Sequence, residues 1–240
     1  MGLINKTSGS VVFNGIKLNP NDISIKEKIG YLPSEINLYK DMTVKEIFDY
    51  HISFYKKSVS KRRKELVRLL KINESVKISN LSLGNLKKVG IVLALMHDPT
   101  LLILDEPTSG LDPLMQNVFH NILLEEKNKG VTILYSSHVL SEVSNLCDRV
   151  GFIKDGVIIK EDLIDNILKN NYTYLTISSH DINKIKNDLK LEIINEKNNE
   201  VKFINNIDNN ELIKKLSKYK IDKLLIENIS LEDMFEKYYK

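Results

Sequence analysis

The sequence has little cysteine and no long apolar run. Its single cysteine, Cys147, excludes an internal disulfide and suits a reducing compartment. No apolar stretch approaches the roughly 20 residues that a transmembrane helix needs. We therefore expect any contact with a membrane to be made through a partner protein.

An excess of one charge sign is also lacking. The 240 residues carry 35 Lys and Arg against 32 Asp and Glu, a formal net charge of +3. This excess is too small to indicate nucleic acid or an anionic membrane surface as a partner. A hydrophobic content of 42% and a charged content of 28% are ordinary for a globular protein, and the length allows one medium domain and one small one.

The apolar pattern of residues 1–160 predicts an α/β domain with a mostly parallel sheet. Asn14-Gly15 and Asp155-Gly156 each predict a hairpin turn, and Thr43 with Glu46 forms a capping box at a helix start. Strands are predicted at residues 29–32, 101–104 and 131–135, the last two buried, and helices at residues 43–55, 61–71, 82–96, from 112 and 139–146. The alternation of strands and helices between residues 81 and 153 favours parallel pairing.

From residue 161 the composition shifts towards Asn, Lys and Ile. We predict a linker at residues 161–171, in which residues 163–171 form a helix or irregular chain, and a small α+β domain at residues 172–240. Its strands are expected near residues 172–178, 191–195, 201–204 and 221–226, and its helices near residues 182–189, 210–218 and 231–239. No catalytic constellation stands out in this part of the sequence.

Residues 101–113 carry the strongest functional pattern. Four consecutive aliphatic residues precede Asp105 and Glu106, so the two acids lie at the carboxyl end of a predicted strand, where open α/β sheets bind ligands. Asp105 is suited to hold a magnesium ion, and Glu106 to orient or deprotonate an attacking water. The simpler interpretation is a core strand that ends in an acidic turn.

The whole run, Leu101-Leu102-Ile103-Leu104-Asp105-Glu106-Pro107-Thr108-Ser109-Gly110-Leu111-Asp112-Pro113, resembles the Walker B and D-loop segment of ABC-type ATPases. The resemblance implies a P-loop NTPase domain with ATP and Mg²⁺ as cofactors, and it assigns Gly110, Leu111 and Asp112 to the D-loop. It implies a helical subdomain at residues 41–80. It covers nearly everything from residue 2 to residue 160, and residues 229–239 resemble the end of drug- and bacitracin-exporter ATPase subunits.

A second motif lies at the start of the helix that leads into this run. Ser82 and Gly84 offer a hydroxyl and free backbone N–H groups to an anion, although the same residues also make an ordinary helix cap. Together with the first motif, they resemble the ABC signature, in which Leu83 and Asn85 replace the usual third and fifth residues. In that family the motif contacts the γ-phosphate of ATP held by the opposite subunit, which implies a dimer of nucleotide-binding subunits.

Two further positions follow from the same resemblance. His138 comes after the strand at 131–135, where the family has a histidine that senses the γ-phosphate and completes the catalytic site with Glu106. Without that context it would be a packed or surface histidine. Ser34 stands after Pro33, where the family usually has a Gln that contacts magnesium. Ser34 lacks the reach of a Gln, so Glu35 substitutes for it or the segment merely ends a strand.

The loop that cradles the phosphates is missing from the sequence. ATP binding in this fold uses a Gly-x-x-x-x-Gly-Lys-[Ser/Thr] loop, and no such run occurs. Residues 6–9 resemble its tail, but Asn5 stands where the glycine is needed. Either the chain is an N-terminally truncated ATPase, or it is an inactive regulatory subunit that lends only its signature motif. Because Glu106 and His138 act on nucleotide held by the same chain, we expect truncation, with the 240 residues inactive alone.

The resemblance also predicts the partners and the location of the protein. We expect a transmembrane permease subunit, a dimer of nucleotide-binding subunits and no nucleic acid, at the cytoplasmic face of the cell membrane. The family's P-loop strand is expected beside residues 101–104, so its absence would expose backbone groups and apolar side chains. The chain alone is therefore expected to be poorly soluble or molten.

Overall fold

The computed structural model describes residues 4, 6–17, 19, 22–55, 60–168, 173–228, 231 and 233. The chain divides into two compact units, Met1–Val139 and Leu140–Lys240. The helix at 139–146 and the second predicted hairpin belong to the second unit by this division. The predicted domain boundary after residue 160 stays a prediction.

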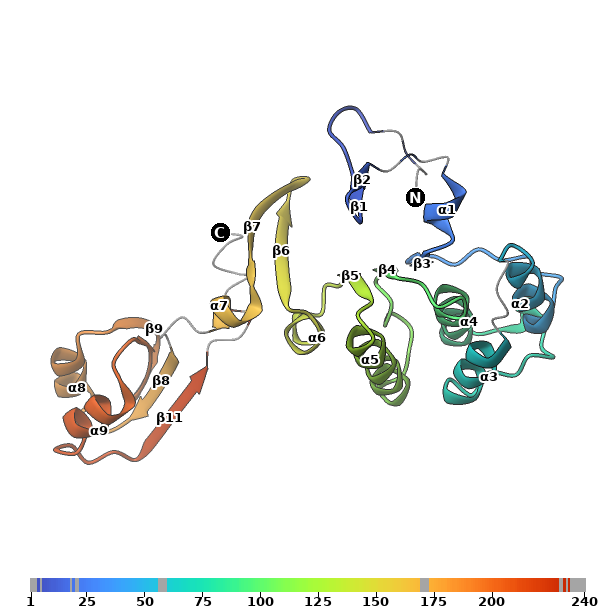
Figure 1. Cartoon of the computed structure of the whole chain (residues 1–240). Coiled ribbons are helices and arrows are strands. Elements are labelled where there is room, and N and C mark those ends of the chain that lie inside the picture. Colours follow the sequence, from blue (N-terminus) through green and yellow to red (C-terminus); the bar gives the residue numbers. More distant parts are fainter. Residues whose placement is uncertain are drawn as a thin grey trace. The chain divides into compact units, whose positions relative to one another are not determined.

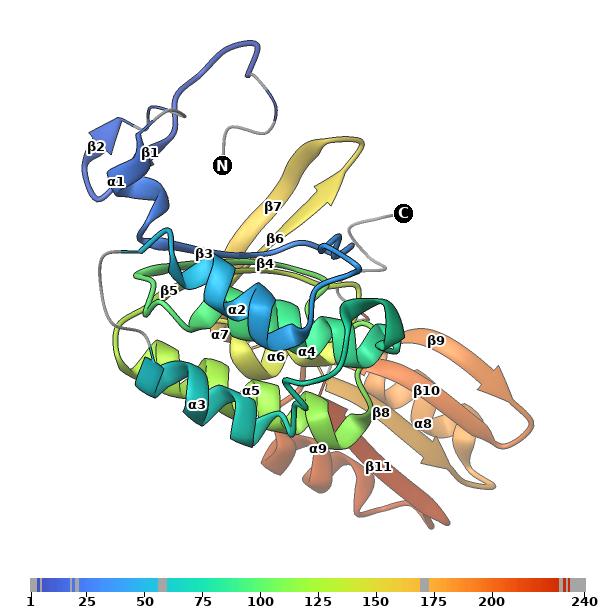
Figure 2. The same ribbon diagram turned by 90° about the vertical axis from the view of Figure 1, so that its right-hand side faces the viewer.

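A three-stranded parallel sheet organises the first unit, which confirms the α/β prediction. Its strands are β3 (Ile29–Leu32), β4 (Leu101–Asp105) and β5 (Thr132–Ser136), in that order. Helices α4 (Leu83–Leu95) and α5 (Pro113–Asn128) lie on one side of the sheet (Figures 1 and 2). Ser82 caps α4 and Asp112 caps α5, as the sequence predicts.

The remaining elements of the first unit agree with the predicted ones, with two short additions. The predicted first hairpin is β1 (Val12–Phe13) with β2 (Ile16–Lys17), and the predicted helices are α2 (Val44–Ile52) and α3 (Ser60–Leu69). The sequence patterns missed α1 (Ile23–Lys26) and the 3₁₀ turn Ile78–Asn80. Elements this short carry too few apolar residues to show a period.

The prediction that β4 and β5 are buried is wrong in its extent. Leu102 and Leu104 of β4 are buried, whereas Leu101 and Ile103 on the other face are partly exposed. Leu134 of β5 is 62% exposed. The physical reason is that α4 and α5 cover the same side of the sheet, so β4 buries alternate residues, and the side chains of the outer strand β5 are at most half-buried.

The expected position of a P-loop strand beside β4 is also wrong. Strand β4 pairs with β3 along one edge and with β5 along the other, so its backbone hydrogen bonds are already used on both sides. In the described part of the chain, the three-stranded sheet ends at β5 and leaves the far edge of that strand without a partner strand. In the described residues β3 is the other outer strand, so a further parallel strand can pair beside β5 or beside β3 but not beside β4.

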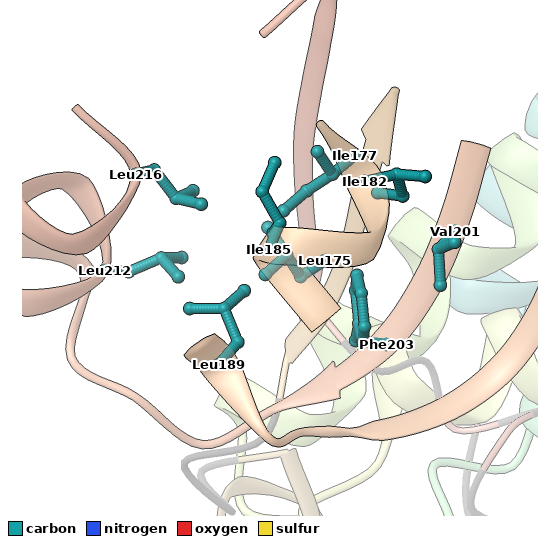
Figure 3. Close-up of a cluster of buried hydrophobic side chains, with 9 residues drawn as sticks. All are labelled: Leu175, Ile177, Ile182, Ile185, Leu189, Val201, Phe203, Leu212 and Leu216. Carbon is teal, nitrogen blue, oxygen red and sulfur yellow. The ribbon is translucent and has the colours of Figure 1, made fainter. Parts of the chain in front are cut away.

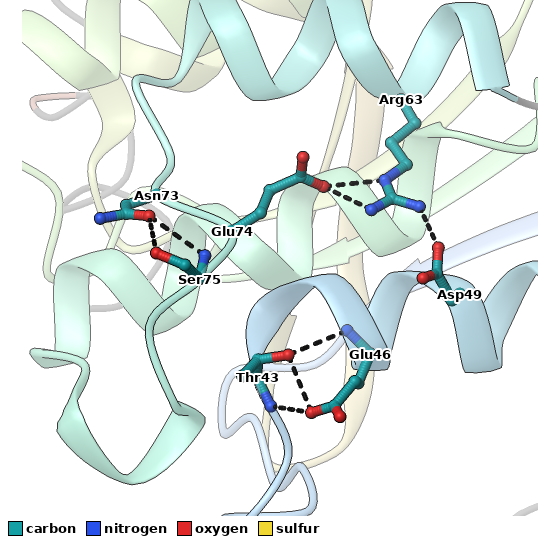
Figure 4. A network of polar contacts seen from close by, with 7 residues as sticks. All are labelled: Thr43, Glu46, Asp49, Arg63, Asn73, Glu74 and Ser75. Carbon is teal, nitrogen blue, oxygen red and sulfur yellow. Dashed lines mark hydrogen bonds and ion pairs between the residues drawn. The ribbon is translucent and has the colours of Figure 1, made fainter.

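Helices α2 and α3 are held together by a polar network (Figure 4). The capping box is present, because Glu46 N–H donates to Thr43 Oγ1 at 3.3 Å and Thr43 N–H donates to Glu46 Oε2 at 2.7 Å. Arg63 of α3 donates Nε–H to Glu74 Oε1 at 2.9 Å and also pairs with Asp49 of α2. One guanidinium therefore fixes α3 against α2 and against the loop that follows α3.

Two histidines pack together where α2 meets the end of α4, His97 buried and His51 half-buried. His97 Nε2–H donates to Ile29 O at 3.2 Å, and its ring stacks on Tyr55 with 4.5 Å between centroids. The His51 ring centroid lies 6.0 Å from that of His97. Burial, followed by the neighbouring His97, lowers the pKa of His51 to about 4. Both rings are therefore neutral parts of the core near pH 7.

The second unit contains a β-hairpin with two flanking helices and, after it, a small α+β domain. Strands β6 (Arg149–Lys154) and β7 (Val157–Leu163) form the predicted second hairpin, flanked by α6 (Leu140–Leu146) and α7 (Ile164–Leu168). Then β8 (Thr173–Ser178), α8 (Ile182–Leu189), β9 (Glu192–Lys197), β10 (Glu200–Asn205), α9 (Asn209–Leu216) and β11 (Lys223–Asn228) follow in a βαββαβ order. The four strands pair antiparallel in the order β11-β8-β10-β9, which is a ferredoxin-like arrangement.

Alternate residues of the central strands make the core of this ferredoxin-like sheet. Leu175, Ile177, Val201 and Phe203 face the helices α8 and α9, whose buried residues complete the cluster (Figure 3). The predicted strands and helices up to residue 228 are confirmed. The helix expected near 231–239 lies almost entirely outside the described residues. Within the described residues, no helix is long and apolar enough to cross a membrane.

We predict that the protein loses stability as the pH falls from about 6.5 towards 4. His51 has a lowered pKa when folded, so between these values the unfolded chain binds more protons and unfolding becomes easier. The expected loss is roughly 2 to 3 kcal/mol, measured by urea unfolding at several pH values. His51→Phe should remove most of this dependence, and the exposed His180→Gln should leave it intact. A flat stability profile in the wild-type chain contradicts the assignment.

Candidate nucleotide-hydrolysis site

The carboxyl ends of the three parallel strands place the predicted site residues along one edge of the sheet. Leu32 of β3 pairs in register with Leu104 of β4. Ser34, two residues after Leu32, and the acids Asp105 and Glu106 therefore lie at the same edge of the sheet. Asp105 pairs in register with Ser136 of β5, two residues before His138. The chain order and the parallel register therefore bring three separate segments to one edge.

Asp105 and the backbone of Glu106 are joined by the hydroxyl of Ser136. Ser136 Oγ–H donates to Asp105 Oδ1 at 2.7 Å, and Glu106 N–H donates to Ser136 Oγ at 3.3 Å. Glu106 also adopts a left-handed backbone with φ +46°, which is uncommon for a residue other than glycine. Backbone of this kind costs of order 1–3 kcal/mol and is concentrated at functional sites.

Glu106 and His138 are in direct contact. His138 Nδ1 lies 2.8 Å from Glu106 Oε2, and because a carboxylate only accepts, Nδ1 carries the hydrogen. A neutral imidazole has a single N–H, and here it is used in the bond to Glu106. Nε2 can therefore donate to a phosphate only if the ring is doubly protonated, or if the bond to Glu106 breaks and the proton moves to Nε2. The His138 side chain is 78% exposed, so a ligand has access to it. The predicted catalytic pair is thus assembled, and its role stays a prediction.

The signature and D-loop residues lie against each other within this chain. A Cβ added to Gly84 would stand 2.5 Å from Gly110 O, and one added to Gly110 would stand 3.3 Å from the Leu83 side chain. Gly110 has φ +80°, a conformation that favours glycine. Ser82 Oγ accepts from Asn85 N–H at 3.4 Å, so its hydroxyl currently caps α4. Leu111, the next residue of the D-loop segment, is buried.

Sequence reasoning missed the residue that holds the segment after β3. Lys87 on α4 is 3% exposed, and its ammonium donates to Ser34 O at 3.0 Å and to Pro33 O at 3.4 Å. Glu35 is exposed. The only available signal was the spacing of Lys87, three and four residues after Gly84 and Leu83, which places it on the same helix face.

The residues at this edge fit a magnesium ligand and a hydrolytic carboxylate, and they do not fit a phosphate cradle. Asp105 supplies a hard carboxylate oxygen of the kind that Mg²⁺ prefers. The 240 residues contain no Gly-x-x-x-x-Gly-Lys-[Ser/Thr] loop. Loops of that type wrap the phosphates with backbone N–H groups, and this sequence offers no such run.

The fold and the convergent acidic edge define the class of the protein, the ATP-binding domain of ABC transporters. The sequence model of a family described as "ABC transporter" matches residues 1–109. The lantibiotic transport ATP-binding protein SrtF of Streptococcus pyogenes is 38% identical over 172 residues, which cover 68% of this chain and 71% of that protein. The chain therefore belongs to the ABC transporter ATP-binding family.

Particular relatives are transport proteins named for antibiotics. The bacitracin transport ATP-binding protein BcrA of Bacillus licheniformis is 36% identical over 77% of this chain and 61% of its own length. The linearmycin resistance ATP-binding protein LnrL of Bacillus subtilis is 34% identical over 74% of this chain and 60% of its own length. The chain thus spans about three fifths of the length of these relatives.

Solved structures show the same fold. An ATP-binding subunit of an ABC transporter superimposes with a TM-score of 0.65 at 29% identity, covering 69% of this chain and 71% of that structure. A dimeric ATP-binding cassette bound to ADP and Pi in a post-hydrolysis state superimposes with a TM-score of 0.59 at 24% identity, over 66% of this chain and 74% of that structure. These likenesses confirm the predicted P-loop NTPase fold.

We predict that Gly84→Ala destabilises the first unit by roughly 1 to 3 kcal/mol. The added Cβ would clash with the backbone oxygen of Gly110, so either α4 or the D-loop segment must move. Hydrogen exchange of buried β4 amides reports this change within the unit. Gly151→Ala, read out on the amides of its own hairpin β6–β7, is the control for a glycine without a close neighbour, because the nearest atom to its added Cβ is 3.9 Å away. Equal effects of the two substitutions would contradict the proposed close contact.

Proposed function

We propose that this chain is the ATP-binding and ATP-hydrolysing subunit of an ABC exporter, coupled to transport through a membrane partner. The observation that carries the proposal is the contact between Glu106 and His138 beside Asp105, at the carboxyl edge of a parallel sheet. ATP bound with Mg²⁺ would supply the scissile phosphate bond. The chain's own residues supply the ion ligand, Asp105, and the carboxylate, Glu106, that orients or deprotonates water.

His138 supports this assignment through its geometry. Its Nδ1–H holds one oxygen of Glu106, which leaves the other oxygen to accept a proton from water. In catalytic sites a residue that is hydrogen-bonded to the general base usually orients that base and does not itself react. We therefore assign His138 the task of fixing the Glu106 carboxylate until the γ-phosphate competes for the ring.

Ser82, Gly84 and their neighbours are proposed to act on a second subunit. The start of α4 presents a hydroxyl and backbone N–H groups, and Leu83 is largely exposed there. A dimer of ATP-binding subunits would let this segment bind the γ-phosphate of ATP held by the other subunit. The dimeric cassette of the same fold supports this arrangement.

A groove beside the helical segment supports a membrane permease as the partner. It has a volume of about 420 Å³ and is bounded by α2, α4 and the chain after β3. Its lining is mostly apolar and aromatic, formed by Asn37, Leu38, Tyr39, Ile47, Tyr50, His51 and Leu93. A groove of this composition fits an amphipathic segment of a partner. The names of the relatives favour antibiotic or peptide export, at the cytoplasmic face of the membrane.

The rival proposal is a regulatory subunit that never hydrolyses ATP and only lends its signature residues to a partner's site. The missing phosphate cradle favours it, while the assembled Glu106–His138 pair favours the hydrolytic role. The two proposals differ in whether ATP hydrolysis depends on Glu106 once a phosphate-binding loop is present.

We predict that the 240-residue chain alone does not bind Mg-ATP measurably, because it contains no phosphate cradle. Isothermal titration calorimetry with ATP and MgCl₂ tests this directly. An affinity in the micromolar range would show that other residues hold the phosphates.

We predict that Glu106→Gln, in a chain completed by a Gly-x-x-x-x-Gly-Lys-[Ser/Thr] segment, lowers ATP hydrolysis by roughly 10² to 10⁴-fold. The amide cannot accept the proton of water, while ATP binding should persist. Phosphate release and bound nucleotide are measured on the same sample. Glu125→Gln, at an exposed acid of α5, is the control. Unchanged hydrolysis removes Glu106 as the base, and a completed wild-type chain that binds without hydrolysing favours the regulatory role.

A further inference from the structure

The most unusual charge in the first unit is the buried ammonium of Lys87. Among the described lysines it is the only buried one, with 3% of its surface exposed. Burial lowers the pKa of Lys87, and the negative charges of Asp105 and Glu106 act in the opposite direction. A buried ammonium is costly compared with an apolar side chain of the same length, so its presence calls for contacts that only a charged donor makes.

Those contacts are with backbone, not with an acid. Lys87 Nζ–H donates to Ser34 O at 3.0 Å and to Pro33 O at 3.4 Å. Both carbonyls belong to the turn that leaves β3, beside the acidic edge of the sheet. Hydrogen bonds from a charged donor are stronger than those between neutral groups, so this turn is tied to α4 by one side chain.

The same face of α4 also carries the signature contact. Gly84 lies three residues before Lys87, almost one turn, and packs on Gly110 O so closely that a Cβ would stand 2.5 Å away. Gly90, three residues after Lys87, packs on Ile36, where a Cβ would meet the side chain at 2.4 Å. One side of α4 therefore contacts the D-loop segment through Gly84, the turn after β3 through Lys87, and Ile36 through Gly90.

We propose that Lys87 is a positioning residue that mechanically couples the signature residues 82–85 to residues 33–36. Its two bonds to the turn carbonyls make α4 and the turn move as one body. A displacement of the helix start, when the signature residues engage a neighbouring nucleotide, is then carried to the segment beside Asp105 and Glu106. The functional meaning of this coupling rests on the proposed function, whereas the coupling itself is a property of the isolated fold.

The first test measures how firmly the turn is held. In ¹⁵N relaxation of the full chain, the amides of Ser34, Glu35 and Ile36 should have order parameters near about 0.85, falling below about 0.6 in Lys87→Met. Lys87→Gln, which retains N–H donors, should restore a substantial part of the order. Lys88→Met is the matched control on the next residue of the same helix. Amides of β4 and β5 in the first unit report whether each variant remains folded.

The second test measures transmission along α4. Gly84→Ala displaces the helix start, and it should shift the amide resonances of residues 33–36 in a chain that has Lys87. The shifts at residues 33–36 should fall at least about threefold in the double variant with Lys87→Met, while shifts near Gly110 persist. Residual coupling below that level is expected, because packing contacts along the same face remain.

The outcomes separate the coupling from the proposed function. Unchanged order at residues 33–36 in Lys87→Met, or equal transmission with and without Lys87, overturns the coupling. If Lys87→Met unfolds the first unit, the comparison rests on Lys87→Gln: a partial loss of order at residues 33–36 with weakened transmission supports the tether, and unchanged order and transmission overturn it. Neither experiment contains nucleotide, so a failure of ATP hydrolysis leaves these results unaffected.

Discussion

The parallel register of β3, β4 and β5 is the constraint on which the rest of the first unit depends. It fixes Leu32 opposite Leu104 and Asp105 opposite Ser136, so three distant chain segments end at one edge. A shift of one residue in β4 would turn Asp105 away from Ser136 and exchange its buried and exposed faces. The register alone therefore brings the chain segments that carry Asp105, Glu106, Ser136 and His138 to the same place.

Much of this arrangement was predictable from the sequence because its signals are local. The capping box at Thr43 and the cap-and-proline start at Asp112 predict helix starts, and the aliphatic run before Asp105 predicts a strand. The motif order then predicts that Glu106 and His138 meet, and they do, at 2.8 Å. The α+β arrangement of the C-terminal residues also followed from periodicity, although the strand order required the structure.

The rest depended on contacts between segments far apart in the chain. No pattern reveals that Lys87 reaches Pro33 and Ser34, because both partners are backbone atoms and any residue there offers the same carbonyl. Continuous apolar runs in β4 and β5 indicated burial on both faces, yet helices cover one side only, which the runs cannot show. The sequence likewise could not predict that β4 pairs with a strand on each side, because the order of strands in a sheet does not follow from their order in the chain.

The left-handed backbone of Glu106 sets stability against chemistry at a single position. A glycine would accept φ +46° without strain, and an asparagine or aspartate with little, so the conformation itself disfavours a glutamate. The acid therefore persists there at an energetic disadvantage that packing elsewhere must offset. Selection for stability alone would favour replacing Glu106, so the residue at position 106 indicates whether the proposed hydrolytic role is retained.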